Sequence, residues 1–115
     1  MHELSLVHGL LRQLAELASK HGASSISRVK VEIGPLSGVV VDSFSFGFEV
    51  LAVHEELTRR AVLEIVEPPL RWRCCHCGAE CMAEGAMPES CPQCRRALLV
   101  PCGGDGIILL QVEME

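Results

Sequence analysis

Two cysteine pairs constrain this chain more than any other feature of its sequence. Cys74 pairs with Cys77 and Cys91 with Cys94, with two residues inside each pair and thirteen residues between the pairs. Pairs with this spacing can place four thiolates around one tetrahedral Zn(II), at zinc–sulfur distances of roughly 2.3 Å. Because four protein ligands leave no position for water or substrate, the pattern predicts a structural zinc site rather than a catalytic one.

Composition and charge argue against several other classes of protein. The chain has 115 residues, seven cysteines and a formal net charge of −5. An acidic chain lacks the basic face that a general nucleic-acid-binding protein turns toward the phosphates. The odd cysteine count, with no signal peptide, leads us to expect a reducing, cytoplasmic setting rather than a secreted disulfide scaffold. No apolar run reaches the roughly 18 residues that a membrane span needs.

Hydrophobic periodicity predicts an α+β fold, with two helices packed on a small three-stranded sheet. Apolar residues at helical spacing predict a helix over 4–20, and alternation predicts a strand over 26–33. A second helix is expected from Asp42, as its N-cap, to about residue 56. It holds all three phenylalanines of the chain and should supply much of the core. Strands follow at 61–66 and 107–113, and the last one should be buried in the main sheet.

The cysteines lie in a segment with boundaries of its own. Pro68-Pro69 forms a stiff linker before this segment, and Gly103-Gly104 closes it. We therefore expect a zinc-binding ribbon domain over 70–104, inserted into an α/β domain made of 1–69 plus 105–115. The inserted segment has few large apolar residues, so it should need its metal ion in order to fold.

A second metal signal lies at the N-terminus, which reads Met1-His2-Glu3. The α-amine, the backbone nitrogen of His2 and the His2 imidazole can close fused chelate rings around one metal ion. A nitrogen or oxygen atom of Glu3 would complete a square. A planar set of nitrogen donors suits Ni(II) or Cu(II) rather than Zn(II). A histidine at position two is also often a solvated terminal residue, so the pattern alone leaves both interpretations open.

Several motifs together resemble the HypA/HybF family of hydrogenase nickel-incorporation proteins, and the resemblance covers the whole chain. They are Met1-His2-Glu3-Leu4-Ser5 before an amphipathic helix, the loop Gly34-x-Leu36-Ser37-Gly38-Val39, then Phe46-x-Phe48-Glu49 and the two cysteine pairs. The resemblance implies a nickel metallochaperone, not an enzyme. Such proteins help deliver Ni(II) to the large subunit of NiFe hydrogenase and work with the HypB GTPase, and some members also feed urease maturation.

The resemblance also implies roles for particular residues. His2 is the principal nickel ligand, Met1 supplies the amine and Glu3 supports the site. The family's zinc ligands match Cys74, Cys77, Cys91 and Cys94.

The chain departs from the family pattern in two places. Members often carry an acidic residue just after the Gly-Val of the loop, whereas this chain has Val40 there and its nearest acid is Asp42. Asp42 is either a substitute for that acid or a helix cap. Three additional thiols belong to Cys75, Cys81 and Cys102, and the sequence leaves open whether they are inert, redox-active or alternative ligands.

Two other functions are compatible with parts of the pattern. One is a zinc-ribbon adaptor that binds nucleic acid or another protein, and the acidic charge argues against the nucleic-acid form of it. The other is an enzyme with a catalytic metal at His2, which no neighbouring acid–base pair supports. The sequence contains no nucleophile-elbow, phosphate-loop or dinucleotide-binding motif.

Overall fold

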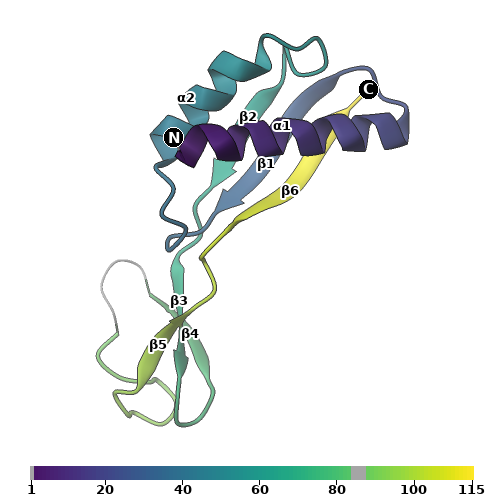
Figure 1. Cartoon of the computed structure of the whole chain (residues 1–115). Coiled ribbons are helices and arrows are strands. Elements are labelled where there is room, and N and C mark those ends of the chain that lie inside the picture. The colour runs from purple at the N-terminus through teal and green to yellow at the C-terminus, as the bar shows by residue number, and fades with distance from the viewer. Residues whose placement is uncertain (1, 84–87) are drawn as a thin grey trace. The chain divides into compact units, whose positions relative to one another are not determined.

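The computed structural model describes residues 2–83 and 88–115, which form two helices and two three-stranded sheets (Figure 1). The predicted α+β class is confirmed. The chain divides into two units. The first consists of Met1–Glu32, Val39–Val66 and Ile108–Glu115, and the second of Ile33–Gly38 and Glu67–Ile107. Within the described residues, neither helix is both long and apolar enough to cross a membrane.

The first sheet is built around β1 (Ile26–Ile33), with β2 (Val62–Val66) on one side and β6 (Ile107–Met114) on the other. β1 and β2 are parallel, and Val29 lies opposite Leu63. A parallel pair needs a crossover, which α2 (Val41–Ala52) provides between the two strands. All three strands of this sheet were predicted from the sequence, within one residue at each end.

Two helices cover one face of this sheet (Figure 1). α1 (His2–His21) begins two residues earlier than predicted and buries an apolar stripe, while β1 and α2 supply the facing side chains. After α1 the amide of Ala23 donates to the carbonyl of Ala18 at 2.9 Å, and Gly22 has φ +65°. This is the arrangement of a Schellman motif, in which glycine relieves the strain of the left-handed residue. The core residues are Val7, Leu10, Leu11, Leu14, Ala18, Ile26, Val29, Val31, Ile33, Phe44, Phe48 and Ala52.

The predicted bounds and N-cap of α2 were wrong. Its N-cap is Val40, which makes no side-chain hydrogen bond, and Asp42 lies inside the first turn. The helix ends at Ala52 rather than near residue 56. Thr58 is fully buried, and its hydroxyl donates to the Ala52 carbonyl at 2.8 Å, so a side chain satisfies a carbonyl that continued helix would have used.

The second helix does supply part of the core, since Phe44, Phe48 and Ala52 are buried, whereas Phe46 is 67% exposed because the helical period turns it to the opposite side. One prediction about the core needs correction. β6 was expected to be buried, yet it is an edge strand on which Ile108 and Leu110 are exposed. A strand at the edge of a sheet with helices on one face has fewer neighbours to cover it.

The second sheet has β3 (Leu70–Cys74) at its centre, between β4 (Glu80–Ala83) and β5 (Leu99–Cys102). Both pairs are antiparallel. One face carries a small core of four buried residues, which are Trp72, Cys74, Cys91 and Leu99. This core is too small to hold a fold of this size without further support, as expected for a metal-dependent unit.

The loop after β1 packs within the second unit. The amide of Leu36 donates to the carbonyl of Gly104 at 2.6 Å, and the amide of Gly34 donates to that of Gly106 at 3.0 Å. A Cβ atom at Gly34 would clash with the backbone of Gly104, so the close approach requires glycine at position 34.

Candidate metal centre

Four cysteines converge in the second unit. The sulfur atoms of Cys74, Cys77, Cys91 and Cys94 all lie within 4.8 Å of one another. The Cys74–Cys94 distance between Sγ atoms is 3.5 Å and the Cys77–Cys91 distance is 3.6 Å. A regular tetrahedron with zinc–sulfur bonds of 2.3 Å has sulfur–sulfur edges of about 3.8 Å. The four thiols therefore have the number and spacing that one tetrahedral metal ion requires.

The two cysteine turns are built alike. In each turn the first cysteine's sulfur accepts a backbone N–H from two residues on, which is His76 for Cys74 and Gln93 for Cys91, both at 3.4 Å. In each, the carbonyl of the first cysteine accepts the amide of the residue four positions later, at 3.0 Å from Gly78 and at 2.8 Å from Arg95 in the second turn. In the folded unit the backbone thus orients both cysteines of each pair toward one point.

The residue four positions after the first cysteine adopts a left-handed conformation in both turns. Gly78 has φ +77°, as glycine readily does, and Arg95 has φ +63°. A non-glycine residue pays a steric penalty there, of roughly 1–2 kcal/mol. The role of Arg95 was not predicted from the sequence, although Arg95 follows Cys91 at the same spacing at which Gly78 follows Cys74.

The same backbone contacts tune the thiols unequally. The pKa of Cys74 is lowered to about 6, mainly by a hydrogen bond from the Cys77 amide and, beyond the opposing desolvation, by the His76 amide. The pKa of Cys91 is lowered as well, chiefly by the amide of Cys94. In each turn it is therefore the first cysteine whose thiol loses its proton more readily.

The second cysteines behave in the opposite way. The Ala79 amide lowers the pKa of Cys77, but desolvation and the neighbouring thiols outweigh it and raise the pKa to about 11. For Cys94 the Arg96 amide lowers the pKa, and desolvation together with the Cys74 and Cys91 thiols raises it overall. A bound cation would deprotonate these thiols, so metal binding must release protons.

The three additional thiols stand outside this cluster. Cys75 is exposed, and its amide donates to the Leu98 carbonyl at 2.7 Å. Cys81 is half-buried and packs against the small core. The thiol of Cys102 lies 3.5 Å from a carboxylate oxygen of Glu80. Among the described residues, only the four cysteines of the two pairs form a group with metal-binding geometry.

The other predicted site lies at the start of α1. His2 is the first residue of the helix and is exposed, whereas Glu3 is half-buried. The amide of Val40 donates to a carboxylate oxygen of Glu3 at 3.4 Å. Met1 lies outside the described residues, so the structure does not place the predicted amine ligand.

The loop position at which an acid was expected contacts Glu3 through its backbone instead. The side chain of Val40 is 56% exposed, and it is the Val40 amide that meets the Glu3 carboxylate. Asp42 is exposed on the first turn of α2, where an acid is favourable to the helix dipole. The capping role considered for Asp42 was therefore wrong.

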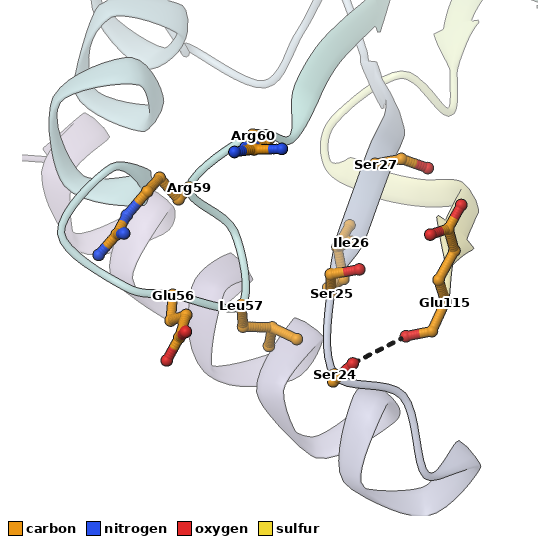
Figure 2. A pocket seen from close by; sticks show the side chains of 9 residues that line it. All are labelled: Ser24, Ser25, Ile26, Ser27, Glu56, Leu57, Arg59, Arg60 and Glu115. Carbon is orange, nitrogen blue, oxygen red and sulfur yellow. Dashed lines mark hydrogen bonds between the residues drawn. The ribbon is translucent and has the colours of Figure 1, made fainter.

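A cavity of about 760 Å³ lies around the start of β1, at the opposite end of α1 from His2 (Figure 2). Its lining includes Arg59 and Arg60 as well as several serines. Two of the serine hydroxyls donate hydrogen bonds to backbone carbonyls. Ser27 donates to the Glu113 carbonyl at 3.2 Å, and Ser24 donates to that of Glu115 at 3.5 Å. This cavity brings together none of the residues predicted from the sequence to bind metal.

These features define a small metal-binding protein, with a helix-covered sheet in one unit and a four-thiolate centre in the other. Comparison with known proteins agrees. The family model described as "Hydrogenase/urease nickel incorporation, metallochaperone, hypA" matches residues 1–114. The chain therefore belongs to the HypA family of metallochaperones. It is a nickel metallochaperone of hydrogenase maturation, in a family that is not enzymatic.

Individual relatives are similar over almost their full length. The hydrogenase maturation factor HypA of Alkalilimnicola ehrlichii is 36% identical, with all of both chains covered. That of a Roseiflexus species is 37% identical, with 100% of this chain and 93% of the relative covered. The solution structure of the nickel metallochaperone HypA from Helicobacter pylori has a TM-score of 0.69 and 28% identity, covering 97% and 96% of the two chains. A second solution structure, of a HypA protein, has a TM-score of 0.79 and 29% identity, covering 100% and 97%.

Proposed function

We propose that this chaperone binds its nickel cargo at the N-terminus, through the amine of Met1, His2 and Glu3, and holds a structural zinc ion on Cys74, Cys77, Cys91 and Cys94. In this proposal residues 1–69 plus 105–115 form the nickel-binding domain, and residues 70–104 form the zinc-binding domain.

The start of α1 at His2 is the observation that carries the nickel site. The first four amides of a helix have no acceptor within the helix. The backbone nitrogens of His2 and Glu3 are among them, so they can lose their protons to a metal ion without breaking the helix. Together with the α-amine and the imidazole of His2, they offer the planar nitrogen set that Ni(II) prefers.

Glu3 would support this site electrostatically. The N-terminal end of a helix carries a partial positive charge, which opposes a cation bound there. The Glu3 carboxylate lies in the first turn and offsets that charge. Its contact with the Val40 amide orients the carboxylate.

An exposed terminal site also suits release of the cargo. His2 is exposed, so a recipient protein can reach the metal without unfolding the domain. The amine and imidazole bind nickel only after losing their protons, so the affinity for nickel should fall as the pH drops toward 6.

The four cysteines suit a different task. Four soft thiolates at tetrahedral spacing favour Zn(II), and a centre with four protein ligands has no open position for exchange. We therefore assign zinc there to folding of the second unit, not to delivery.

The partners follow from the family's task. The recipient is the large subunit of NiFe hydrogenase, and a HypB-type GTPase acts with the chaperone in the cytoplasm. Urease maturation is a second destination that the family description includes.

Nickel titration of matched histidine variants tests the proposal. His2→Ala should lose the single nickel site, whereas His8→Ala, which removes an exposed histidine from the same helix, should keep it. Equal nickel binding by the two variants would show that the N-terminal site is wrong.

A further inference from the structure

α2 is apolar on two sides. Its inner side buries Phe44 and Phe48 against the domain core. On its outer side Phe46, Val50 and, just past its end, Val53 follow one another at spacings of four and three residues and are all exposed. Exposed apolar side chains that adjoin one another on a helix often mark a protein–protein interaction site. The outer stripe of Phe46, Val50 and Val53 is therefore a surface that a partner would cover.

A groove lies beside this outer stripe, between α2 and the first turn of α1. It encloses about 360 Å³ and is lined by Glu3, Leu4, Ser43, Phe46, Gly47 and Val50. Gly47 allows the two helices to approach closely here. A Cβ atom at this position would lie 3.3 Å from Cδ2 of Leu4 and 3.4 Å from Cγ2 of Val7. The hollow is thus a consequence of close helix packing, and it is large enough for one or two apolar side chains.

Among the described residues, the charged side chains on α2 and in the lining of the groove are acidic. α2 carries Asp42 and Glu49 and contains no lysine or arginine, and Glu3 lies at the groove itself. In the part of the chain that the structure describes, the salt bridges formed belong to Arg28, so Asp42 and Glu49 have no ion-pair partner there. A partner that brings cations would meet complementary charge, whereas an anionic lipid surface would meet repulsion.

We propose that this groove and the outer stripe of α2 are a docking site for an amphipathic helix of a protein partner. That helix would insert apolar side chains beside Phe46 and place lysine or arginine residues against Asp42, Glu49 and Glu3. Helix-in-groove recognition uses anchors at the three- and four-residue spacings that the stripe displays. A second copy of this chain is a poor occupant, because pairing the same surface would oppose acid with acid.

The groove lies next to the residues proposed to bind nickel. Glu3 both lines the groove and follows His2, so a helix seated there lies next to the proposed nickel site. In this respect the inference rests on the proposed function. A partner that docks beside the cargo needs no large movement of either protein to exchange nickel.

Site-specific photocrosslinking tests the docking site in the full-length chain. A benzophenone amino acid replaces Phe46 in one variant and Val62 in the control, because Val62 is similarly exposed but lies on β2. Both variants are irradiated in cells that assemble a nickel enzyme, and the crosslinked peptides are identified by mass spectrometry. We expect position 46 to give at least a tenfold higher yield, with a helical segment of a maturation partner that is apolar and rich in lysine or arginine.

Several results would overturn the inference. They are equal yields at the two positions, a product dominated by a second copy of the chain, a crosslink within the chain to residues 67–107, or an acidic partner segment.

A charge substitution in the groove separates docking from nickel binding. Val50→Lys, combined with the crosslinker at position 46, should lower the yield at least tenfold, while Val62→Lys should leave it unchanged. Both should keep the native circular dichroism spectrum and one nickel site. An undiminished yield in folded Val50→Lys would refute the docking site and leave the nickel site standing. Full nickel binding by His2→Ala, with the crosslink retained, would refute the nickel site alone.

Discussion

Arg95 adopts the left-handed backbone conformation that Gly78 adopts at the equivalent place in the other cysteine turn, with φ values of +63° and +77°. Both amides donate to the carbonyl of the first cysteine of their turn. The conformation is therefore required by the shape of the turn rather than by the residue type.

This equivalence predicts an asymmetric response to alanine. Gly78→Ala should destabilise the metal-bound second unit by about 1 kcal/mol, because it introduces a Cβ atom at a left-handed position. Arg95→Ala should change the stability by less than about 0.5 kcal/mol, because the penalty is already present. Chemical denaturation of the zinc-loaded protein measures both. Equal losses of stability in the two variants would contradict this explanation of the left-handed conformation.

The unequal thiol pKa values predict how zinc affinity depends on pH. At pH 7 Cys74, with a pKa of about 6, is mostly a thiolate, whereas Cys77, with a pKa of about 11, is protonated and must give up its proton to bind. Below about pH 6 Cys74 also takes up a proton. Zinc affinity should therefore fall as the pH drops, and fall more steeply below pH 6. Competition with a chromophoric chelator from pH 5 to 8 measures it, and a slope that does not change would contradict the assignment of Cys74.

Removal of zinc should unfold the second unit and spare the first. Trp72 is the only tryptophan of the chain, and it is buried beside Cys74, Cys91 and Leu99. Chelation should shift its fluorescence to longer wavelength as the indole meets water. The helical circular dichroism should persist, because α1 and α2 pack in the other unit. Loss of the helical signal at the same chelator concentration would mean that the two units fold together.

The buried hydrogen bond of Thr58 should contribute to stability independently of metal binding. Thr58→Val keeps the shape of the side chain but removes its hydrogen bond to the Ala52 carbonyl, which then accepts only the 3.3 Å bond from the Glu55 amide, at a cost of about 0.5–1.5 kcal/mol. Ser27→Ala removes a hydroxyl that also donates to a carbonyl, but at an exposed position, and should cost less than about 0.5 kcal/mol. Thermal unfolding of both variants makes the comparison. A Thr58→Val protein as stable as the Ser27→Ala protein would remove our explanation for the end of α2.

Local patterns predicted the two helices, the three strands of the first sheet and the four-cysteine cluster, because periodicity and cysteine spacing act over short distances, but they did not predict β3, β4 and β5 individually. The apolar stripe on α1 and the alternation in β1 predicted a sheet covered by helices. The spacing of the two cysteine pairs predicted that four sulfur atoms converge. The start of α2 was predicted wrongly. Asp42 was expected as the cap because its residue type suits one, but the amide of Phe44 donates to the carbonyl of Val40, which makes Val40 the N-cap.

The remaining misses depend on neighbours outside the element concerned. Thr58 lies six residues beyond the end of α2, and no pattern in the helix itself marks its contact with Ala52. β6 was expected to be buried because it is apolar, but its place at the sheet edge is decided by topology.

The central claim is that the chain's own terminus chelates nickel, and extending that terminus tests it most directly. Two residues added before Met1 leave the His2 imidazole in place but move the α-amine away from it. We predict that calorimetric titration will show nickel affinity at least tenfold weaker than for the native chain, with zinc binding unchanged. Equal nickel affinity with and without the extension would contradict the terminal chelate.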